Sequence, residues 1–421
     1  KNVQTCKGSH THTVIPHPKD KGIIYIYVSG SAGVRKEMAG CVEGTDPADE
    51  TNSYYRLDVI KVPLANPEAA EVVTGARIFT GIGARPRRGN QPAPQGNAAA
   101  SGPRNCHDVS AYPAFGLLAG ACGSHGLLVD VSNPERPVRL DAAADTNFSL
   151  WHTAVFSNDG TKLLFTDEWG GGTGPMCQAT SMLEMGGNTV LSIGKDRKLT
   201  KHAYFKIPTG QTAQENCVSH NGALIPVPGR DIMVQGWYQG GVSVLDFTDP
   251  NKPFELAFFD RGPIDAPPAA GDTTRRRGGT IGGSWGAYYY NGYVYSSEMA
   301  RGLDILEMMP TDQLSANELA AAKLVMLDEF NPQSQPKIVW PAAFPVIRSY
   351  LDQLVRGNGL STARTTAIAK ALDAAEAKSG AARATALRTL AGQVEKDVAG
   401  ASDKDRVKAM AGEMRRVASS R

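Results

Sequence analysis

Histidine is rare in this chain, and its positions repeat. Only eight histidines occur among the 421 residues. Four of them open segments that read as a β-strand, a turn and a second strand, because apolar and polar residues alternate on both sides of a Gly, Pro or Asn/Asp turn. These four are His12, His107, His152 and His220. Imidazole binds Zn, Cu, Fe and Ni, so histidines at equivalent places in a repeat predict a metal site wherever the fold brings them together.

Carboxylates occupy a second equivalent position. Glu168 and Glu298 each lie where the second strand of a hairpin ends. A carboxylate there can ligate a metal, orient a ligating histidine or act as a general base. His10 is a further candidate, because it forms an H-x-H pattern with His12 and alternate residues of a strand face the same side. The predicted ligand set is His12, His107, His152, His220 and Glu168, and the predicted cofactor is a transition metal ion such as Zn, Cu or Fe.

Two other interpretations of the histidines stay open. They can be structural residues that hydrogen-bond to neighbouring backbone, or they can form an acid/base site without a metal. The remaining histidines, His17, His125 and His202, fall on turns or outer strands, and we expect them at the surface. Large aromatic residues cluster at the same strand ends as the candidate ligands, where they would either plug the centre of the fold or line an apolar substrate mouth. These are Trp151, Trp169, Trp237, Tyr238 and Trp285.

The template that positions the histidines is clearest between Trp151 and Gly172. Two alternating segments flank Asn158-Asp159-Gly160, and Asp-Gly between apolar strands is a strong hairpin signal. The template occurs five times, and in the fifth copy Trp285 stands where the others have histidine. Each copy continues with further strand segments, and four strands per unit at a spacing of roughly 40–60 residues are typical of a β-propeller blade. The innermost strands of a propeller line its central channel, so this fold would bring the histidines to one level.

We therefore predict an all-β fold, a β-propeller, over residues 1–340 and a linker with an α-helical appendage over residues 341–421. Five repeats can close a five-bladed ring. Because the first residues, KNVQTC, resemble the last strand of a preceding repeat, a ring of seven with two blades upstream is the alternative. The five repeats span residues 9–80, 106–141, 151–208, 217–261 and 283–330.

The C-terminal region has a different pattern. From Pro345 onward it is Ala-rich with amphipathic helical periodicity, which predicts three or four helices with Ser361 and Ser402 as N-caps. It carries 14 Lys/Arg against 8 Asp/Glu from Val346. A basic helical tail is usually a solvated face or an intramolecular dock, and it is also a candidate surface for a protein partner. The net charge of +2 for the whole chain does not favour nucleic-acid binding, and no apolar run approaches the ~20 residues of a transmembrane helix.

Six cysteines, an even number without a CxxC pair, favour disulfides over a zinc site. We expect sequential pairing: Cys6 with Cys41, Cys106 with Cys122, and Cys177 with Cys217. Such bonds would place the chain in an oxidising, extracytoplasmic compartment, whether periplasmic, secreted or at the cell surface. The alternative is a cytosolic protein with buried free thiols.

The segments LLVDVSNPERPVRL, VSVLDFTDPNKPFELAFFD and GLDIL resemble the LVIVD-repeat proteins, secreted bacterial propellers whose repeat is named for that strand. The resemblance extends from Gln4 to about Trp340 and includes QTCKGSHTHT and FTDEWGGGTGPMC. It implies an extracytoplasmic propeller and gives little about chemistry. The chain departs from the family in lacking the blades that usually precede the QTC segment, and the resemblance implies nothing about the helical tail.

Two functions follow from these observations. The first is an extracytoplasmic propeller with a histidine-lined central metal site, which would make it a metal-dependent enzyme of unknown substrate. The second is a non-catalytic scaffold for protein–protein or cell-surface interaction, with the helical region as its dock. No HExxH motif supports a zincin, and the GxSxG spacing at 282–286 opens a predicted strand and does not form the strand-to-helix nucleophile elbow of a serine hydrolase.

Overall fold

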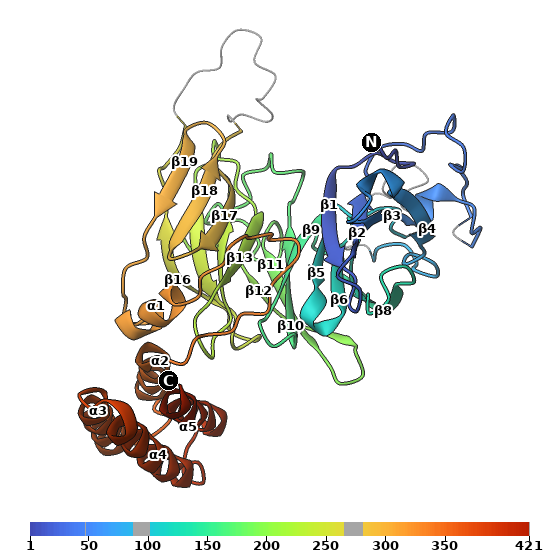
Figure 1. The fold of residues 1–421 in the computed structure, drawn as a ribbon. Coiled ribbons are helices and arrows are strands. Elements are labelled where there is room, and N and C mark those ends of the chain that lie inside the picture. The colour runs from blue at the N-terminus through green and yellow to red at the C-terminus, as the bar shows by residue number, and fades with distance from the viewer. Residues whose placement is uncertain (47, 87–101, 265–280, 421) are drawn as a thin grey trace.

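The computed structural model describes residues 1–421 except 47, 87–101, 265–280 and 421. Within the described residues, five antiparallel groups of strands stand side by side like a fan, and a bundle of helices lies at one end of it (Figure 1). This arrangement is propeller-like and agrees with the repeats of the sequence. The number of blades in a closed ring stays a prediction.

Each group is a meander in which consecutive strands pair. The first sheet contains β1 (Thr11–Pro16), β2 (Ile23–Ser29), β3 (Leu57–Pro63) and β4 (Glu71–Ala76). The second contains β5 (Asp108–Tyr112), β6 (Leu117–Ala121), β7 (His125–Asp130) and β8 (Val138–Ala144). The third contains β9 (Trp151–Phe156), β10 (Lys162–Asp167), β11 (Asn188–Ile193) and β12 (Leu199–Phe205). The fourth contains β13 (Asn221–Ile225), β14 (Ile232–Gly236), β15 (Val242–Asp246) and β16 (Phe254–Phe259). Single-turn 3-10 helices occur at η1 (Ser53–Tyr55), η2 (Pro67–Ala69) and η4 (Pro113–Phe115).

The fifth group has three strands, β17 (Ser284–Tyr290), β18 (Tyr293–Glu298) and β19 (Gly302–Leu306). A short parallel pairing of β13 with β17 joins it to the fourth sheet. Four strands per repeat predict a fourth strand in this repeat, and for the described residues this prediction is wrong. The segment after β19 contains the helix α1 (Ala316–Lys323) and then a stretch without regular secondary structure.

The inner strands β1, β5, β9, β13 and β17 are the first strands of their sheets. The sheets pack face to face, so every residue of β5, β9 and β15 is buried, including the two polar residues that each strand contains. The hairpin of β9 and β10 turns at Asn158–Gly160 as predicted, and Gly160 supplies the positive φ of +70° that the turn needs. The packing of neighbouring sheets against one another sets the position at which each inner strand begins.

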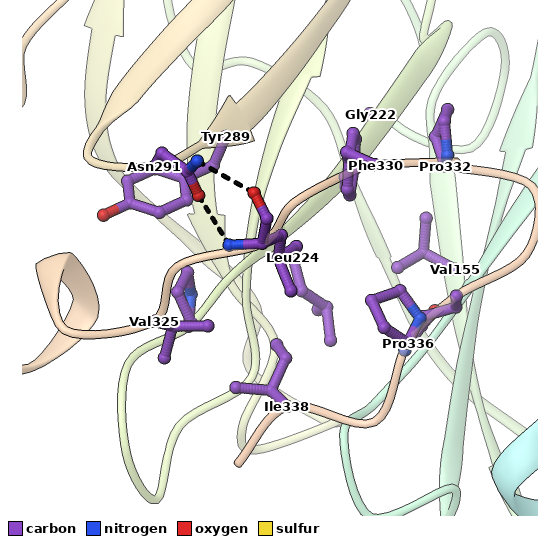
Figure 2. Close-up of a pocket in the computed structure, with 14 residues that line it drawn as sticks. Val155, Gly222, Leu224, Tyr289, Asn291, Val325, Phe330, Pro332, Pro336 and Ile338 are labelled. Atoms are coloured by element: carbon purple, nitrogen blue, oxygen red, sulfur yellow. Dashed lines mark hydrogen bonds between the residues drawn. The ribbon is translucent and has the colours of Figure 1, made fainter. Parts of the chain in front are cut away.

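A connecting segment, residues 324–340, runs across one end of the inner strands; we call it the strap. The Asn291 side chain exchanges hydrogen bonds of 2.8 and 3.0 Å with the backbone of Leu327 in the strap (Figure 2). Ala111 pairs through its backbone with Gln333 and Gln335. The Gln335 side chain bonds both the N–H and the C=O of Phe156. Between the strap and β9, β13 and β17 remains a cavity of about 40 Å³ with mostly apolar walls.

Four helices follow the strap: α2 (Phe344–Arg356), α3 (Thr362–Glu376), α4 (Gly380–Asp397) and α5 (Lys404–Ser419). They bury one apolar core of their own that includes Ile347, Leu372 and Met410. Ser361 caps α3 as predicted, because its hydroxyl accepts a hydrogen bond from the Arg364 N–H. The predicted cap Ser402 is wrong. Asp403 caps α5 instead, and the Ser402 hydroxyl donates to the Asn358 carbonyl.

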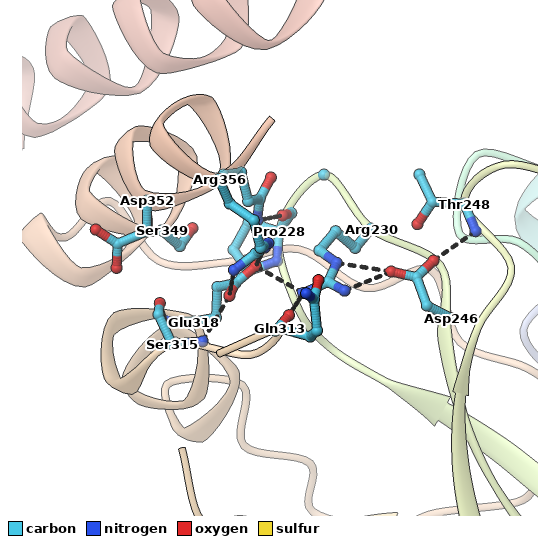
Figure 3. Close-up of polar contacts among 12 residues, drawn as sticks. Pro228, Arg230, Asp246, Thr248, Gln313, Ser315, Glu318, Ser349, Asp352 and Arg356 are labelled. Atoms are coloured by element: carbon cyan, nitrogen blue, oxygen red, sulfur yellow. Dashed lines mark hydrogen bonds and ion pairs between the residues drawn. The ribbon is translucent and has the colours of Figure 1, made fainter. Parts of the chain in front are cut away.

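A buried ion network holds the helices against the fourth sheet (Figure 3). The carboxylate of Glu318, on α1, accepts hydrogen bonds from Arg356 of α2 at 2.7 and 3.0 Å and from Arg230 at 2.9 Å. Arg230 also contacts Asp246 at the end of β15. The Gln353 side chain adds a bond to the carbonyl of Pro228 at 2.8 Å. The helical region is therefore docked on the sheets of its own chain, as one of the interpretations of the basic tail expected.

The three disulfides are the ones predicted: Cys6–Cys41, Cys106–Cys122 and Cys177–Cys217. All six cysteines are thereby paired. Disulfides of this number are typical of proteins in oxidising compartments. Within the described residues, no helix combines the length and apolar character needed to cross a membrane.

Candidate metal centre

Four histidine rings form a continuous row at the end of the inner strands opposite the strap. Each ring comes from a different sheet, and adjacent ring centroids are 4.2, 3.9 and 4.3 Å apart. Trp285, from the fifth sheet, extends the row at 4.8 Å from the last histidine. We call the four histidines the histidine row: His10, His107, His152 and His220.

The inner strands explain why these rings meet. His10, His107 and His220 each stand immediately before an inner strand, and His152 is the second residue of β9. Neighbouring inner strands begin at the same level, so the residues that open them are brought together. His10 Nε2 lies 2.7 Å from His107 Nε2, which is a hydrogen-bonding distance.

Glu168 closes the site from the third sheet. It follows β10 and is buried, with Oε2 at 3.5 Å from His152 Nε2 and Oε1 at 3.6 Å from His220 Nε2. The Tyr238 hydroxyl donates a hydrogen bond to Oε1. The carboxylate is therefore held in place by a group that is not a candidate ligand.

The spacing fits a metal ion. His107, His152 and Glu168 each offer a ligand atom, and these atoms lie within 4.8 Å of one another. Zn–N bonds of about 2.1 Å in tetrahedral geometry separate two ligand atoms by roughly 3.4 Å, close to the two contacts of Glu168. Several buried ring nitrogens of the row have no hydrogen-bond partner in the described structure. They are His107 Nδ1, His152 Nδ1 and His220 Nε2.

Electrostatics favours neutral imidazoles, the form that binds metals. Burial lowers the pKa of His152 well below 6.5, and the other histidines of the row lower it further. Burial also lowers the pKa of His220 to about 4, against the opposing effect of its hydrogen bond to the Trp285 carbonyl. Burial raises the pKa of Glu168, and the hydrogen bond from Tyr238 opposes that shift.

His220 has a defined tautomer. Its Nδ1–H donates to the carbonyl oxygen of Trp285, so its Nε2 carries the lone pair that faces Glu168. A lone pair and a carboxylate oxygen at 3.6 Å repel each other unless a cation or a proton lies between them. Two acceptors face each other here, and a bound cation would satisfy both.

The structure gathers four of the five predicted ligands and leaves out His12. Thr11 and Thr13 bond the carbonyls of His107 and Val109 on β5, so the residue between them points away. His12 is exposed, with Nδ1 at 3.5 Å from the Ser9 hydroxyl. His10 takes the place in the row.

A spacing in the sequence could have identified His10. A proline follows His107 and His220 at the sixth position after each, and the same spacing joins His10 to Pro16. The H-x-H pattern made it easy to miss that His10, and not His12, corresponds to His107 and His220, because both histidines lie on one predicted strand. In the structure, the hydrogen bonds of Thr11 and Thr13 to the backbone of His107 and Val109 distinguish them.

Of the other candidates, Glu298 lies on the fifth sheet and outside the row. Its Oε1 accepts a hydrogen bond from the Gly283 N–H at 2.7 Å. The surface prediction for His125 is wrong: it is buried on β7, where the Ser124 hydroxyl contacts its Nδ1 at 2.9 Å. His17 and His202 are half-buried.

The aromatic residues divide into two groups. Trp151, Trp237 and Tyr238 are buried, and only Tyr238 contacts the row, with its ring centroid 5.0 Å from that of His220. Trp285 is 47% exposed and borders the row, with its ring centroid 4.8 Å from that of His220.

No family model matches this sequence, and no curated protein matches it. Solved structures that resemble the chain include a protein from Lactobacillus plantarum, 10% identical with a TM-score of 0.42 over 74% of this chain and 73% of the other. Hydrazine synthase of Kuenenia stuttgartiensis is 11% identical with a TM-score of 0.40 over 73% and 74%. A putative TolB from Agrobacterium tumefaciens is 11% identical with a TM-score of 0.30 over 68% of each chain. Likenesses this weak identify no function.

Proposed function

We propose that the chain is an extracytoplasmic β-propeller protein with a transition-metal centre at the histidine row, and that this centre is the active site of a metal-dependent enzyme. The observation that carries the proposal is the convergence of four imidazoles and Glu168, with buried ring nitrogens of His152 and His220 left without a partner. Buried polar atoms in proteins are nearly always paired, so this group of exceptions needs a ligand to explain it.

The donor set favours Zn, Cu or Fe over Mg or Ca, which prefer oxygen ligands. Such an ion supplies Lewis-acid or redox chemistry at the centre. In this arrangement the histidines hold the ion, and Glu168 either completes the ligand set or moves a proton at its Oε2. Tyr238 keeps Glu168 oriented in both roles.

We infer that a substrate approaches the row from the end opposite the strap. The strap covers the far end of the inner strands and makes backbone bonds to β5 there. The row is bordered by Trp285 and by His10, both of which are exposed. We infer that a substrate reaches the ion between these two residues, along a partly aromatic wall.

Elemental analysis of the purified protein tests the proposal. About one Zn, Cu or Fe ion per chain is expected, with loss of that ion in the His107→Ala/His152→Ala variant. His202→Ala is the matched control, because His202 lies on the outer strand β12, where it contacts Ser192 and Asn251. Wild-type protein that folds and, after incubation with these metals, holds none of them would refute the proposal.

A second candidate function is a scaffold that presents a surface to a protein partner. The outer face of the fifth sheet favours it, because that face exposes Tyr293, Leu303 and Ile305, an apolar group of a kind that marks interaction surfaces. A metal-free protein would leave this candidate as the better one.

A further inference from the structure

Asp108 is a buried carboxylate next to the histidine row that the proposed centre does not yet use. It follows His107 as the first residue of β5, and it is 1% exposed. Neither of its carboxylate oxygens has a hydrogen-bond partner in the described structure. A buried carboxylate without a partner is costly, so the site must compensate for it in the functional state.

The nearest donor is the neighbouring imidazole. His107 Nδ1 lies 3.3 Å from Asp108 Oδ1, and this nitrogen is also without a partner. The two atoms are within reach but are not aligned as a hydrogen bond. A modest rotation of the ring would align them, and catalytic hydrogen bonds are often long before the ligand is bound.

The other ring nitrogen of His107 faces the row. His107 Nε2 is 2.7 Å from His10 Nε2. If Nδ1 carries the proton, the Nε2 lone pair is available on the side of the row, either to a hydrogen bond from His10 or to an ion. If Nε2 carries the proton, His107 cannot bind an ion through that atom, and Asp108 stays unpaired.

His220 already shows the same arrangement. Its Nδ1–H donates to the Trp285 carbonyl, which leaves Nε2 free. Histidines that bind metals almost always donate their second ring N–H to a carboxylate or a carbonyl, and this contact fixes the tautomer and raises the basicity of the ligand. His107 and His220 stand on either side of His152 in the row, so both neighbours of the central ring would be oriented in this way.

We propose that Asp108 is a positioning residue of the metal centre: it accepts the Nδ1–H of His107 and so directs the His107 Nε2 to the ion. This inference rests on the proposed function. It adds a residue that holds no ion itself and whose negative charge, next to the site, favours a divalent cation.

The test compares Asp108→Asn with wild-type protein for Zn²⁺ affinity, measured by competition with a chromogenic chelator, and for the visible spectrum of the Co²⁺-loaded form. We expect the Zn²⁺ affinity of the variant to fall by about 10–100-fold, with an unchanged number of ions and a shifted Co²⁺ spectrum. Asp231→Asn is the matched control. Asp231 is also buried, but it pairs with Lys162 at 2.8 Å just before β14. The control should keep the wild-type affinity and spectrum.

A measurement on wild-type protein avoids the risk that Asp108→Asn does not fold. Nitrogen-15 NMR of the Zn²⁺-loaded protein reports the tautomer of His107, and we expect the proton on Nδ1. A proton on Nε2, or a variant with wild-type affinity and spectrum, would overturn the role of Asp108 while leaving the metal centre intact. Wild-type protein that binds neither Zn²⁺ nor Co²⁺ would instead refute the proposed function and this inference with it.

Discussion

The two ends of the inner strands differ in how their polar groups are satisfied. At the strap end, side-chain amides pair with backbone. Gln335 bonds the backbone N–H and C=O of Phe156, and Asn158 bonds the backbone N–H and C=O of Ile338. At the other end, the histidine row leaves ring nitrogens and the carboxylate of Asp108 without partners. Both ends belong to the same five inner strands.

We infer that the strap end contributes mainly to stability and the histidine row mainly to function. Paired side-chain amides and backbone groups, as at the strap end, are what a folding domain needs. Unpaired buried polar groups at the row destabilise the protein, and natural chains keep such groups mainly at functional sites. We therefore expect substitutions at the strap end to change the free energy of unfolding without changing metal binding. Substitutions in the row should do the opposite.

The largest effect is expected at the ion network that docks the helices near the strap. Glu318→Gln removes the charge between Arg230 and Arg356 and leaves both guanidinium groups without that partner. The free energy of unfolding should fall by about 3–5 kcal/mol in chemical denaturation. The metal content should stay at the wild-type level, and a loss of metal in a folded variant would show that the two ends are coupled.

The next effect is a pH dependence that comes from a buried histidine outside the row. Burial, with Arg85 and Arg139 nearby, lowers the pKa of His125 from 6.5 to about 4. The unfolded state then binds more protons than the folded state, so stability is present above pH 6.5 and is lost as the pH falls to 4. The shift corresponds to about 3 kcal/mol. Denaturation of His125→Gln across this range should show a correspondingly smaller loss, with unchanged metal content, whereas a pH dependence equal to that of wild type would place the titration elsewhere.

A smaller effect is expected within the strap. Gln335→Ala leaves the N–H and C=O of Phe156 without their side-chain partner, and Phe156 is fully buried. Stability should fall by about 2 kcal/mol in chemical denaturation. The Zn²⁺ affinity should be that of wild type, and a tenfold change would contradict the separation of the two ends.

Local chemistry let the sequence predict much of this fold. Asn158-Asp159-Gly160 marked the central hairpin because few residues other than Asp, Asn and Gly adopt its turn, and Ser361 marked a helix start through its hydroxyl. The cysteine pairs also followed, because each pair closes a loop within one repeat or between adjacent ones.

What the sequence could not provide depends on tertiary contacts. The proline spacing marks His10, but only the structure shows that the bonds of Thr11 and Thr13 to neighbouring backbone turn His12 away from the row. The burial of His125 comes from the neighbouring sheets, since its own strand would be half-exposed in isolation. Asp108 was overlooked for a similar reason: an acidic residue inside an alternating strand looks like a solvent-facing position until the packing shows that it is covered.

The central claim is that the row exists to hold a metal ion and does not serve to join the sheets. The most direct test is His152→Leu, measured for both metal content and the unfolding free energy of the metal-free protein. Leucine fills much of the same space and removes a buried nitrogen that has no partner. We predict that the metal is lost, while the metal-free variant is as stable as wild type or more stable by up to about 1 kcal/mol. A wild-type protein without metal, together with a clearly less stable variant, would contradict the account and identify the histidines as structural.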